Sequence, residues 1–262
     1  GDEKKSGWRL RLALAALLLV FIAGAALPGN QVRRFALKER AHHEVLYYSE
    51  GLTGPVLVTR DRLNGLRNLF INAIAEVHDS FGGMQTFKLM GHLPFLLHRG
   101  EPRNVLMVTY GAGIASGAVA LHPIRELHVV ELEPAVVEAS RQFADRNLNV
   151  MDDPRVRIHL EDGRNFLYNT DQRFDIIISD ATNPGSADSW LLYTVEFYRL
   201  CQSRLNTGGM MAQWLPIHTG TPEGYKAILA AFQAVFPHTS IWFTKDYTLL
   251  IGSPEKLELS WP

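Results

Sequence analysis

Two glycines and a glutamate, spaced across one strand-helix-strand unit, are suited to binding a nucleoside. The apolar run 105–109 leads into Gly111-Ala-Gly113, and a helix-like segment and a second apolar run ending at Glu131 follow. Glycines in a turn between strand and helix let the backbone approach a ligand closely. Glu131 follows Gly111 by twenty positions. This spacing predicts a carboxylate at the tip of the neighbouring strand, where it can accept hydrogen bonds from both hydroxyls of a ribose.

The glycine spacing departs from the dinucleotide-binding pattern. The third glycine, Gly117, lies four residues after Gly113 rather than three. We therefore favour a nucleoside ligand without a pyrophosphate, such as an adenosylmethionine-type cofactor, over a nicotinamide cofactor. A purely structural turn is the alternative interpretation.

Polar residues also follow the later apolar runs, at Asp162-Gly163, Asp180 and Gln213. In a doubly wound sheet the ligand lies beyond the carboxyl ends of the strands. Asp162 is placed to receive the exocyclic amine of adenine, whereas Asp180 is expected opposite the glycine turn, facing the reactive end of the cofactor. The alternative for Asp180 is a helix cap or a turn with Asn183.

The elements that position these residues alternate regularly from Arg103 onward. Strands are expected at 104–109, 126–131, 155–160, 174–179, 208–215, 239–244 and 247–252. Helices are expected at 114–122, 134–147, 163–168, 190–205 and 222–235. This alternation predicts an α/β fold with a mostly parallel seven-stranded sheet, in which the last two strands form an antiparallel edge hairpin.

The segment before Arg103 has a different pattern. Residues 31–50 are expected to form a polar connector, and 45–78 a small antiparallel β unit with short strands near 56–59 and 69–72. A break at 80–83 and a helix over 84–98 follow.

Composition excludes several classes of site. The chain has 262 residues, a net charge of −1 and no basic stripe, so nucleic acid is not an expected partner. Its one cysteine, Cys201, excludes an intrachain disulfide and a cysteine-based zinc cluster, and it is expected to pack in a helix. The histidines form no ligand pattern, so no metal is predicted.

The N-terminal segment is strongly apolar. Sixteen residues, 12–27, carry no charge and are flanked by basic residues on both sides. A membrane span needs about 20 residues, which interfacial Trp8 and the arginines can complete. We favour a membrane-anchoring helix within 1–30, with the remaining chain on the cytoplasmic side, because an adenosylmethionine-type substrate is made in the cytosol. A signal peptide with a cleavage site near Ala23-Gly-Ala25 is the rival.

Motifs spread over about two hundred residues carry a family resemblance. They are Gly91-His-Leu-Pro-Phe-Leu-Leu-His98, Tyr110-Gly-Ala-Gly113, Val129-Val-Glu-Leu-Glu-Pro134, Asp153-Pro-Arg-Val-Arg157, Glu161-Asp-Gly-Arg-Asn-Phe166, Phe174-Asp-Ile-Ile-Ile-Ser-Asp180, Thr182-Asn-Pro184, Glu196-Phe-Tyr-Arg199 and Gln213-Trp-Leu215. From about Tyr47 to Ser253 the chain resembles the spermidine synthase (polyamine aminopropyltransferase) family, most of all its bacterial members fused to membrane-transporter-like spans.

The resemblance implies a fold, a reaction and an assembly. The fold is a methyltransferase-like (Rossmann-like) sheet, here 84–262, preceded by a connector and small β domain at 31–83. The reaction transfers an aminopropyl group from decarboxylated S-adenosylmethionine to an amine such as putrescine and releases methylthioadenosine. The expected assembly is a homodimer or homotetramer, anchored to a bacterial inner membrane.

The resemblance also assigns residues to roles. Asp180 is the expected catalytic base, and Gly111, Gly113, Glu131, Asp162 and Gly163 are expected to bind the cofactor. We predict that Asn183, Gln213, Tyr247 and Glu76 bind the substrate.

The chain departs from the family pattern around the amine. Asn183 stands where the family has a second aspartate, and Glu76 stands where it has a glutamine. Asn72-Ala73 replaces Asp-Gly, and Thr86-Phe87-Lys88 replaces Tyr-His-Glu. The turn at 109–113 also contains fewer glycines than the family's Gly-Gly-Gly-Asp-Gly.

Two further functions stay open. One is a methyltransferase, or an enzyme that cleaves S-adenosylmethionine itself, on the same fold. The other is a non-catalytic domain of a membrane transporter that senses the cofactor or polyamines.

Overall fold

The computed structural model describes residues 8, 13–22, 42–181, 183–185, 189–217, 220–244 and 247–256. The chain forms two compact units, Gly1–Ala41 and His42–Pro262. In the first unit, residues 13–22 form a helix with exposed apolar side chains. Searched over the described residues, the chain contains no helix long and apolar enough to cross a membrane. Residues 12 and 23–27 of the predicted span lie outside that description.

The second unit begins with a four-stranded antiparallel sheet. Its strands are β1 (His43–Glu50), β2 (Pro55–Asp61), β3 (Arg67–Ile71) and β4 (Ile74–His78), paired in that order. The predicted antiparallel β unit is therefore confirmed. The structure extends this unit to His43, so the predicted connector is wrong for residues 43–44, and residues 45–50, expected in both segments, belong to β1, which pairs with β2 with a register shift between Val45 and Tyr47. Most side chains of β1 are half-buried, so the strand lacks the alternation that marks one apolar face.

The hairpin between β3 and β4 holds an unusual backbone conformation. Its two turn residues, Asn72 and Ala73, have φ angles of 50° and 65°. Two-residue hairpin turns with positive φ at both positions favour Asn-Gly, because glycine alone avoids the steric cost of a Cβ. Ala73 therefore stores backbone strain of about 1–2 kcal/mol.

The larger sheet has seven strands. They are β5 (Asn104–Val108), β6 (Glu126–Glu131), β7 (Val156–Leu160), β8 (Phe174–Ser179), β9 (Leu205–Pro216), β10 (His238–Phe243) and β11 (Tyr247–Ser253). Their order is β10-β11-β9-β8-β5-β6-β7; β5 to β9 run parallel, and β10 and β11 form the antiparallel edge. The predicted mostly parallel sheet with an edge hairpin is confirmed.

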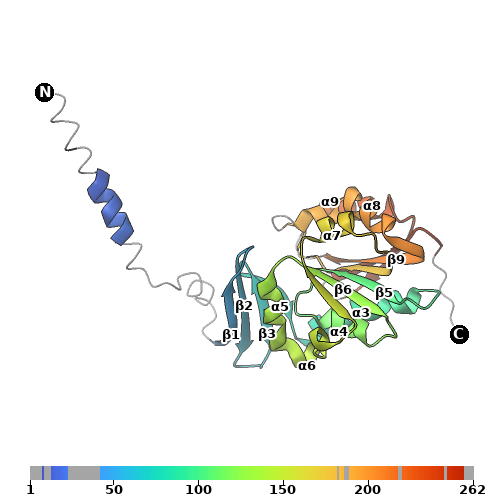
Figure 1. Ribbon diagram of the computed structural model, residues 1–262, viewed down its shortest axis with the longest axis horizontal. Helices are drawn as coiled ribbons and strands as arrows, with labels where there is room; N and C mark the ends of the chain where they lie inside the picture. The colour runs from blue at the N-terminus through green and yellow to red at the C-terminus, as the bar shows by residue number, and fades with distance from the viewer. Residues whose placement is uncertain are drawn as a thin grey trace. The chain divides into compact units, whose positions relative to one another are not determined.

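Helices cover both faces of this sheet. They are α3 (Phe81–Leu97), α4 (Ile114–Ala120), α5 (Pro134–Ala139), α6 (Ala144–Asn147), α7 (Gly163–Asn169), α8 (Val195–Ser203) and α9 (Pro222–Gln233). Figure 1 shows α7, α8 and α9 on one face and α3, α4 and α6 on the other. Alternate strand residues serve the two sides: Met107 packs in the cluster with α3 and α4, and Leu106 in the cluster with α8 and α9.

Three boundaries differ from the sequence-based expectation. The helix predicted over 134–147 is broken into α5, a 3₁₀ turn at Ser140–Phe143 and α6, and the helix predicted over 190–205 is a 3₁₀ turn at Ser189–Tyr193 followed by α8. Ser140 Oγ donates to the Val137 carbonyl at 2.7 Å, a local bond that competes with the helical pattern. The expected break at 80–83 is the start of α3, whose N-cap is Ser80.

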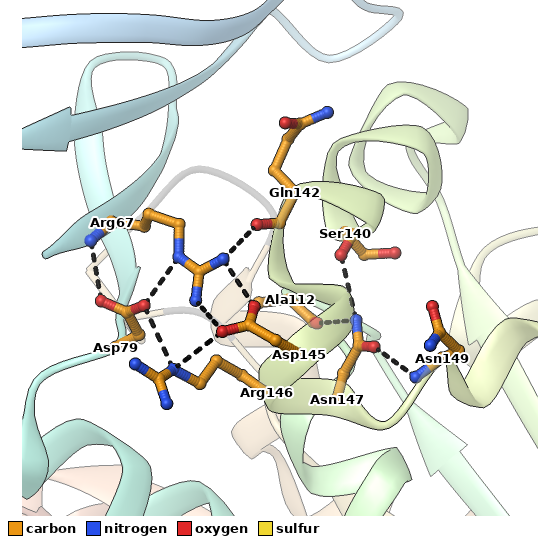
Figure 2. A network of polar contacts seen from close by, with 9 residues as sticks. All are labelled: Arg67, Asp79, Ala112, Ser140, Gln142, Asp145, Arg146, Asn147 and Asn149. Atoms are coloured by element: carbon orange, nitrogen blue, oxygen red, sulfur yellow. Dashed lines mark hydrogen bonds and ion pairs between the residues drawn. The ribbon is translucent and has the colours of Figure 1, made fainter. Parts of the chain in front are cut away.

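A buried arginine ties the small sheet to the helices of the large one (Figure 2). Arg67 Nε donates to Asp79 Oδ2 at 2.7 Å, next to β4. Its Nη1 donates to Asp145 Oδ1 at 2.6 Å and to the Gln142 carbonyl at 2.7 Å, and its Nη2 donates to Asp145 Oδ2 at 3.0 Å. Because Asp145 belongs to α6, this bidentate contact fixes the small sheet where it can form one wall of a site.

Candidate functional site

A cavity of about 480 Å³ lies at the carboxyl ends of the parallel strands. Ligand-binding cavities typically measure about 300–1,000 Å³. In the sheet β5 lies between β6 and β8, so this edge is the topological switch point at which doubly wound sheets bind ligands. The polar residues in its lining are Thr53, Asn72, Glu76, Thr109, Glu131, Glu133, Glu161, Asp162, Arg164 and Ser189. The small sheet thus contributes one wall and the large sheet the other.

The glycine turn after β5 has the conformation that the sequence indicates. Gly111 and Gly113 have φ angles of 55° and 73°, in the left-handed region that favours glycine. A Cβ at Gly113 would lie 2.6 Å from the Tyr110 hydroxyl oxygen. Neither glycine is among the described residues that line the cavity; they shape the turn that carries Thr109 to it, and their contact with a cofactor stays a prediction.

Thr109 was not predicted as a site residue. Its φ angle is 67°, and a β-branched residue in this region is a strained outlier of the kind found at functional sites. The Thr109 hydroxyl donates to the backbone carbonyl of Asp180, which joins the ends of β5 and β8. The sequence holds one signal of this role, because Thr109 stands at the first position of the glycine-rich turn.

Glu131 is held rigidly at the end of β6. Its Oε2 accepts the Tyr110 backbone N–H and its Oε1 accepts the Glu133 backbone N–H, both at 2.9 Å. Burial raises the pKa of Glu131; the backbone N–H groups of Glu133, Tyr110 and Leu132 oppose that rise, and the charge of Glu133 adds to it. Each carboxylate oxygen keeps a second lone pair, so the side chain can still accept two hydroxyl hydrogen bonds from a ribose.

Glu133 was also missed, and it closes one side of the cavity. Its Oε2 accepts the backbone N–H of Thr53 at 2.8 Å and the Thr53 hydroxyl at 3.1 Å. Its Oε1 accepts the Ala135 N–H at 3.1 Å, which caps α5. The loop between β1 and β2 is therefore fastened beside Glu131. A carboxylate directly before Pro134 is a helix-start signal that could have indicated the cap.

Asp162 and Gly163 both line the cavity, as predicted for cofactor-binding residues. Asp162 Oδ1 accepts the backbone N–H groups of Arg164 and Asn165 at 3.0 and 2.9 Å and so caps α7. The other carboxylate oxygen takes no part in the cap. A Cβ at Gly163 would lie 2.6 Å from Val108 Cγ1, so only glycine lets α7 approach the end of β5. Contact with adenine stays a prediction.

Asp180 lies directly after β8, beside the glycine turn. Its backbone N–H donates to the Val108 carbonyl at 3.0 Å. Burial raises the pKa of its carboxyl group well above the usual range, and the negative charges of Glu76 and Glu131 raise it further. The structure thus groups Asp180 with two carboxylates that line the cavity, although Asp180 itself is not among the described lining residues.

Three predicted substrate residues are not among the described residues that line this cavity, although Gly185, which is hydrogen-bonded to Asn183, lines both this cavity and a second one. Asn183 lines that second, mostly apolar cavity of about 450 Å³, and its Oδ1 accepts the Gly185 N–H at 2.8 Å. Gln213 is fully buried in β9, and its Nε2 donates to the Trp214 carbonyl at 2.9 Å. Tyr247 packs against Trp214, with ring centroids 5.2 Å apart. The predicted substrate residue Glu76, in contrast, lines the first cavity.

Metal-ligand side chains are not clustered in the part of the chain that the structure describes. No group of three or more histidine, cysteine, aspartate or glutamate residues there has the geometry to hold a metal ion. Cys201 is buried in α8 as a free thiol, which confirms its predicted packing.

Comparison with known proteins identifies a domain type. The spermine/spermidine synthase domain matches residues 85–244. The chain is 39% identical over 126 residues to a polyamine aminopropyltransferase of Serratia proteamaculans, which covers 47% of this chain and 43% of that protein. A polyamine aminopropyltransferase of Yersinia pestis is 38% identical over the same length, covering 47% and 42%. The aligned region thus spans less than half of these relatives.

Solved structures share the fold. A spermidine synthase crystallised in complex with a transition state analogue superposes with a TM-score of 0.73 at 21% identity, covering 80% of this chain and 74% of that one. The spermidine synthase of Thermotoga maritima gives 0.71 at 21% identity, covering 80% and 73%. Human methyltransferase-like protein 13 gives 0.51 at 21% identity, covering 67% and 82%.

Proposed function

The chain belongs to the spermine/spermidine synthase domain family, and from this premise we propose that it is a polyamine aminopropyltransferase. It transfers the aminopropyl group of decarboxylated S-adenosylmethionine to a primary amine such as putrescine and releases methylthioadenosine. The observation that carries the proposal is the placement of Glu131 and Asp180 at the ends of β6 and β8, on either side of β5 and its glycine turn.

The cofactor's adenosyl half fits the large-sheet wall of the cavity. Glu131 has free lone pairs for the two ribose hydroxyls, and its backbone hydrogen bonds keep the carboxylate in one orientation. Asp162 has one carboxylate oxygen left for an exocyclic amine. Burial raises the pKa values of Glu76, Glu131 and Asp180, and a positive sulfonium bound beside them would favour their ionised forms and be attracted to them.

Asp180 then acts on the acceptor amine. The ammonium form gives a proton to the Asp180 carboxylate, and the freed lone pair forms a bond to the propyl methylene next to sulfur. The carbon–sulfur bond breaks, and its electron pair stays on sulfur, which leaves as a neutral thioether. Burial raises the pKa of Asp180, so its carboxylate is a stronger base than an exposed aspartate. Alignment of amine and methylene supplies the remaining rate enhancement.

An activity assay tests this proposal. Methylthioadenosine should form only when decarboxylated S-adenosylmethionine and a diamine are both present. Asp180→Asn should lower kcat by about 10²- to 10⁴-fold, while calorimetry shows unchanged binding of methylthioadenosine. Asp171→Asn, an exposed carboxylate outside the site, is the matched control. Failure to form methylthioadenosine with any amine would exclude the proposal.

The same cofactors separate the proposal from its alternatives. A methyltransferase, or an enzyme that cleaves S-adenosylmethionine, would bind the carboxylated form at least as tightly as the decarboxylated form. A sensor domain would retain its cellular function after Asp180→Asn, since binding without chemistry needs no base. An aminopropyltransferase should bind the decarboxylated cofactor more tightly than S-adenosylmethionine, and Asp180→Asn should abolish its function in cells.

We also propose that the N-terminal segment attaches the chain to a membrane and that the chain forms a homodimer or homotetramer. The uncharged run 12–27 between basic flanks supports an anchor in a bacterial inner membrane, with the catalytic domain in the cytoplasm and a relation to members fused to transporter-like spans. Fractionation of cells that express the full chain and a 42–262 variant tests the anchor. Light scattering in detergent tests a homodimer or homotetramer, and a monomer would contradict it.

A further inference from the structure

Glu76 brings a charge to the small-sheet wall of the cavity. It lies on β4, and its half-buried side chain lines the cavity opposite the ends of the large sheet. Its carboxylate has no hydrogen bond or ion pair with any residue that the structure describes. Burial raises the pKa of Glu76 to about 7. A carboxylate that is half-buried without a partner is costly, unless a ligand supplies the missing donor.

The groups that face Glu76 are mostly acidic. Burial raises the pKa values of Asp180, at the end of β8, and of Tyr193, at the end of a 3₁₀ turn, and the negative charge of Glu76 adds to both rises. The other titratable residues in the described cavity wall are Glu131 from β6 and Glu133, Glu161, Asp162 and Arg164 from the loops and helix that follow β6 and β7. Arg164 is the one cation in that described lining, and it exerts no influence on the pKa of Glu76. No described cation of the cavity wall is paired with Glu76, so a cationic group of a ligand would meet an unpaired carboxylate.

Asn183 and Glu76 both differ from the family pattern in their charge. The family resemblance implies an acid at 183 and a glutamine at 76, whereas this chain has the amide Asn183 and the acid Glu76. The Asn183 amide oxygen is used by the Gly185 N–H, and the residue lines the second cavity. Glu76 thus places a carboxylate on β4, whereas Asn72, Lys88 and Asn183 stand where the family has acids.

We propose that Glu76 is a specificity-determining residue, which accepts hydrogen bonds from a primary ammonium at the end of a short alkyl chain. This inference rests on the proposed function and names the substrate chemistry that the same cavity selects. Both substrates carry such a group: the donor at the end of its aminopropyl arm and a diamine acceptor at its far end. Ammonium offers three donors, so it can bridge Glu76 and a neighbouring carboxylate.

Paired ligands measured by calorimetry on the full chain test the inference. The first pair is decarboxylated S-adenosylmethionine and methylthioadenosine, which lacks the aminopropyl arm. The second is 1,4-diaminobutane and 1-aminobutane, each added to the chain saturated with methylthioadenosine. In at least one of the two pairs, the wild type should bind the ligand with the additional ammonium more tightly. Glu76→Gln should reduce the ratio of the two dissociation constants in that pair by about 10- to 100-fold. Glu44→Gln, a half-exposed carboxylate on β1, is the matched control and should leave it unchanged.

The outcomes distinguish donor from acceptor as the source of the ammonium, and ammonium recognition by Glu76 from the proposed aminopropyl transfer. A loss confined to the first pair assigns Glu76 to the donor, and a loss confined to the second assigns it to the acceptor. Unchanged preference in both pairs, with an active wild type, overturns the inference and leaves the proposed function standing. A Glu76-dependent preference in a chain that forms no methylthioadenosine overturns the function and retains ammonium recognition. Absence of binding in the wild type overturns both.

Discussion

Replacement of Arg67 by methionine should destabilise the chain severely, because it leaves a buried carboxylate without its cation. The Asp79 side chain is 2% exposed, and Arg67 Nε is its close partner at 2.7 Å. Arg146 Nε lies 3.6 Å from the same carboxylate but is half-exposed, so it replaces Arg67 poorly. Removal of one partner from a buried ion pair costs about 3–5 kcal/mol.

The second arm of the arginine contributes less. The Asp145 side chain is 57% exposed, so water screens its attraction to Arg67. Exposed pairs are worth about 0.2–1 kcal/mol. We therefore expect Asp145→Asn to lower the free energy of unfolding by at most about 1 kcal/mol, and Arg67→Met by about 3–5 kcal/mol.

Equilibrium unfolding in urea at pH 7 measures both variants. The double variant Arg67→Met with Asp79→Asn gives the sharper comparison, since it removes the uncompensated charge and should be more stable than Arg67→Met alone. If Arg67→Met lost less than about 1 kcal/mol, or if the double variant were the less stable of the two, the buried charge would not be the source of the effect.

Three other predictions concern two backbone positions and a histidine pair, of which His128 is buried and His159 half-buried. Ala73→Gly should raise the free energy of unfolding by about 1 kcal/mol by relieving the positive φ angle of 65°, and an unchanged melting temperature would contradict this. Gly117→Ala should destabilise the chain or prevent its folding, because its Cβ would lie 2.4 Å from a backbone oxygen; a native urea midpoint would refute the close packing. Burial lowers the pKa values of His128 and His159, which share a hydrogen bond of 2.9 Å. Below about pH 6.5 the unfolded chain therefore binds more protons than the folded chain, so the free energy of unfolding should decrease as the pH is lowered. His128→Gln should weaken this pH dependence, measured by urea titrations at pH values from about 8 to 5.

Local apolar runs were sufficient to predict the large sheet. Strands such as Phe174–Ser179 are buried on both faces, so their sequences are continuously apolar and bounded by polar residues. The polar residue at each boundary then marks the carboxyl end of a strand, and two of these residues, Glu131 and Asp162, line the cavity; their contact with a cofactor stays a prediction.

Features that depend on distant pairing were not visible in the sequence. β1 has half-buried residues and becomes a strand through its pairing with β2. Glu133 and Thr53 are eighty residues apart, and the hydrogen bonds between them arise only when the small sheet packs on α5. The family resemblance places Asn183 with the substrate; in the structure its side chain forms a turn with Gly185 and lines the second cavity, and its contact with the substrate stays a prediction.

The most direct test of the proposed function is the balance of products from one reaction mixture. The purified chain is incubated with decarboxylated S-adenosylmethionine and 1,4-diaminobutane, and both products are quantified by mass spectrometry. Aminopropyl transfer through Asp180 predicts methylthioadenosine and an amine extended by one aminopropyl group in equal amounts. A methylated amine, or methylthioadenosine without any extended amine, would contradict the proposal.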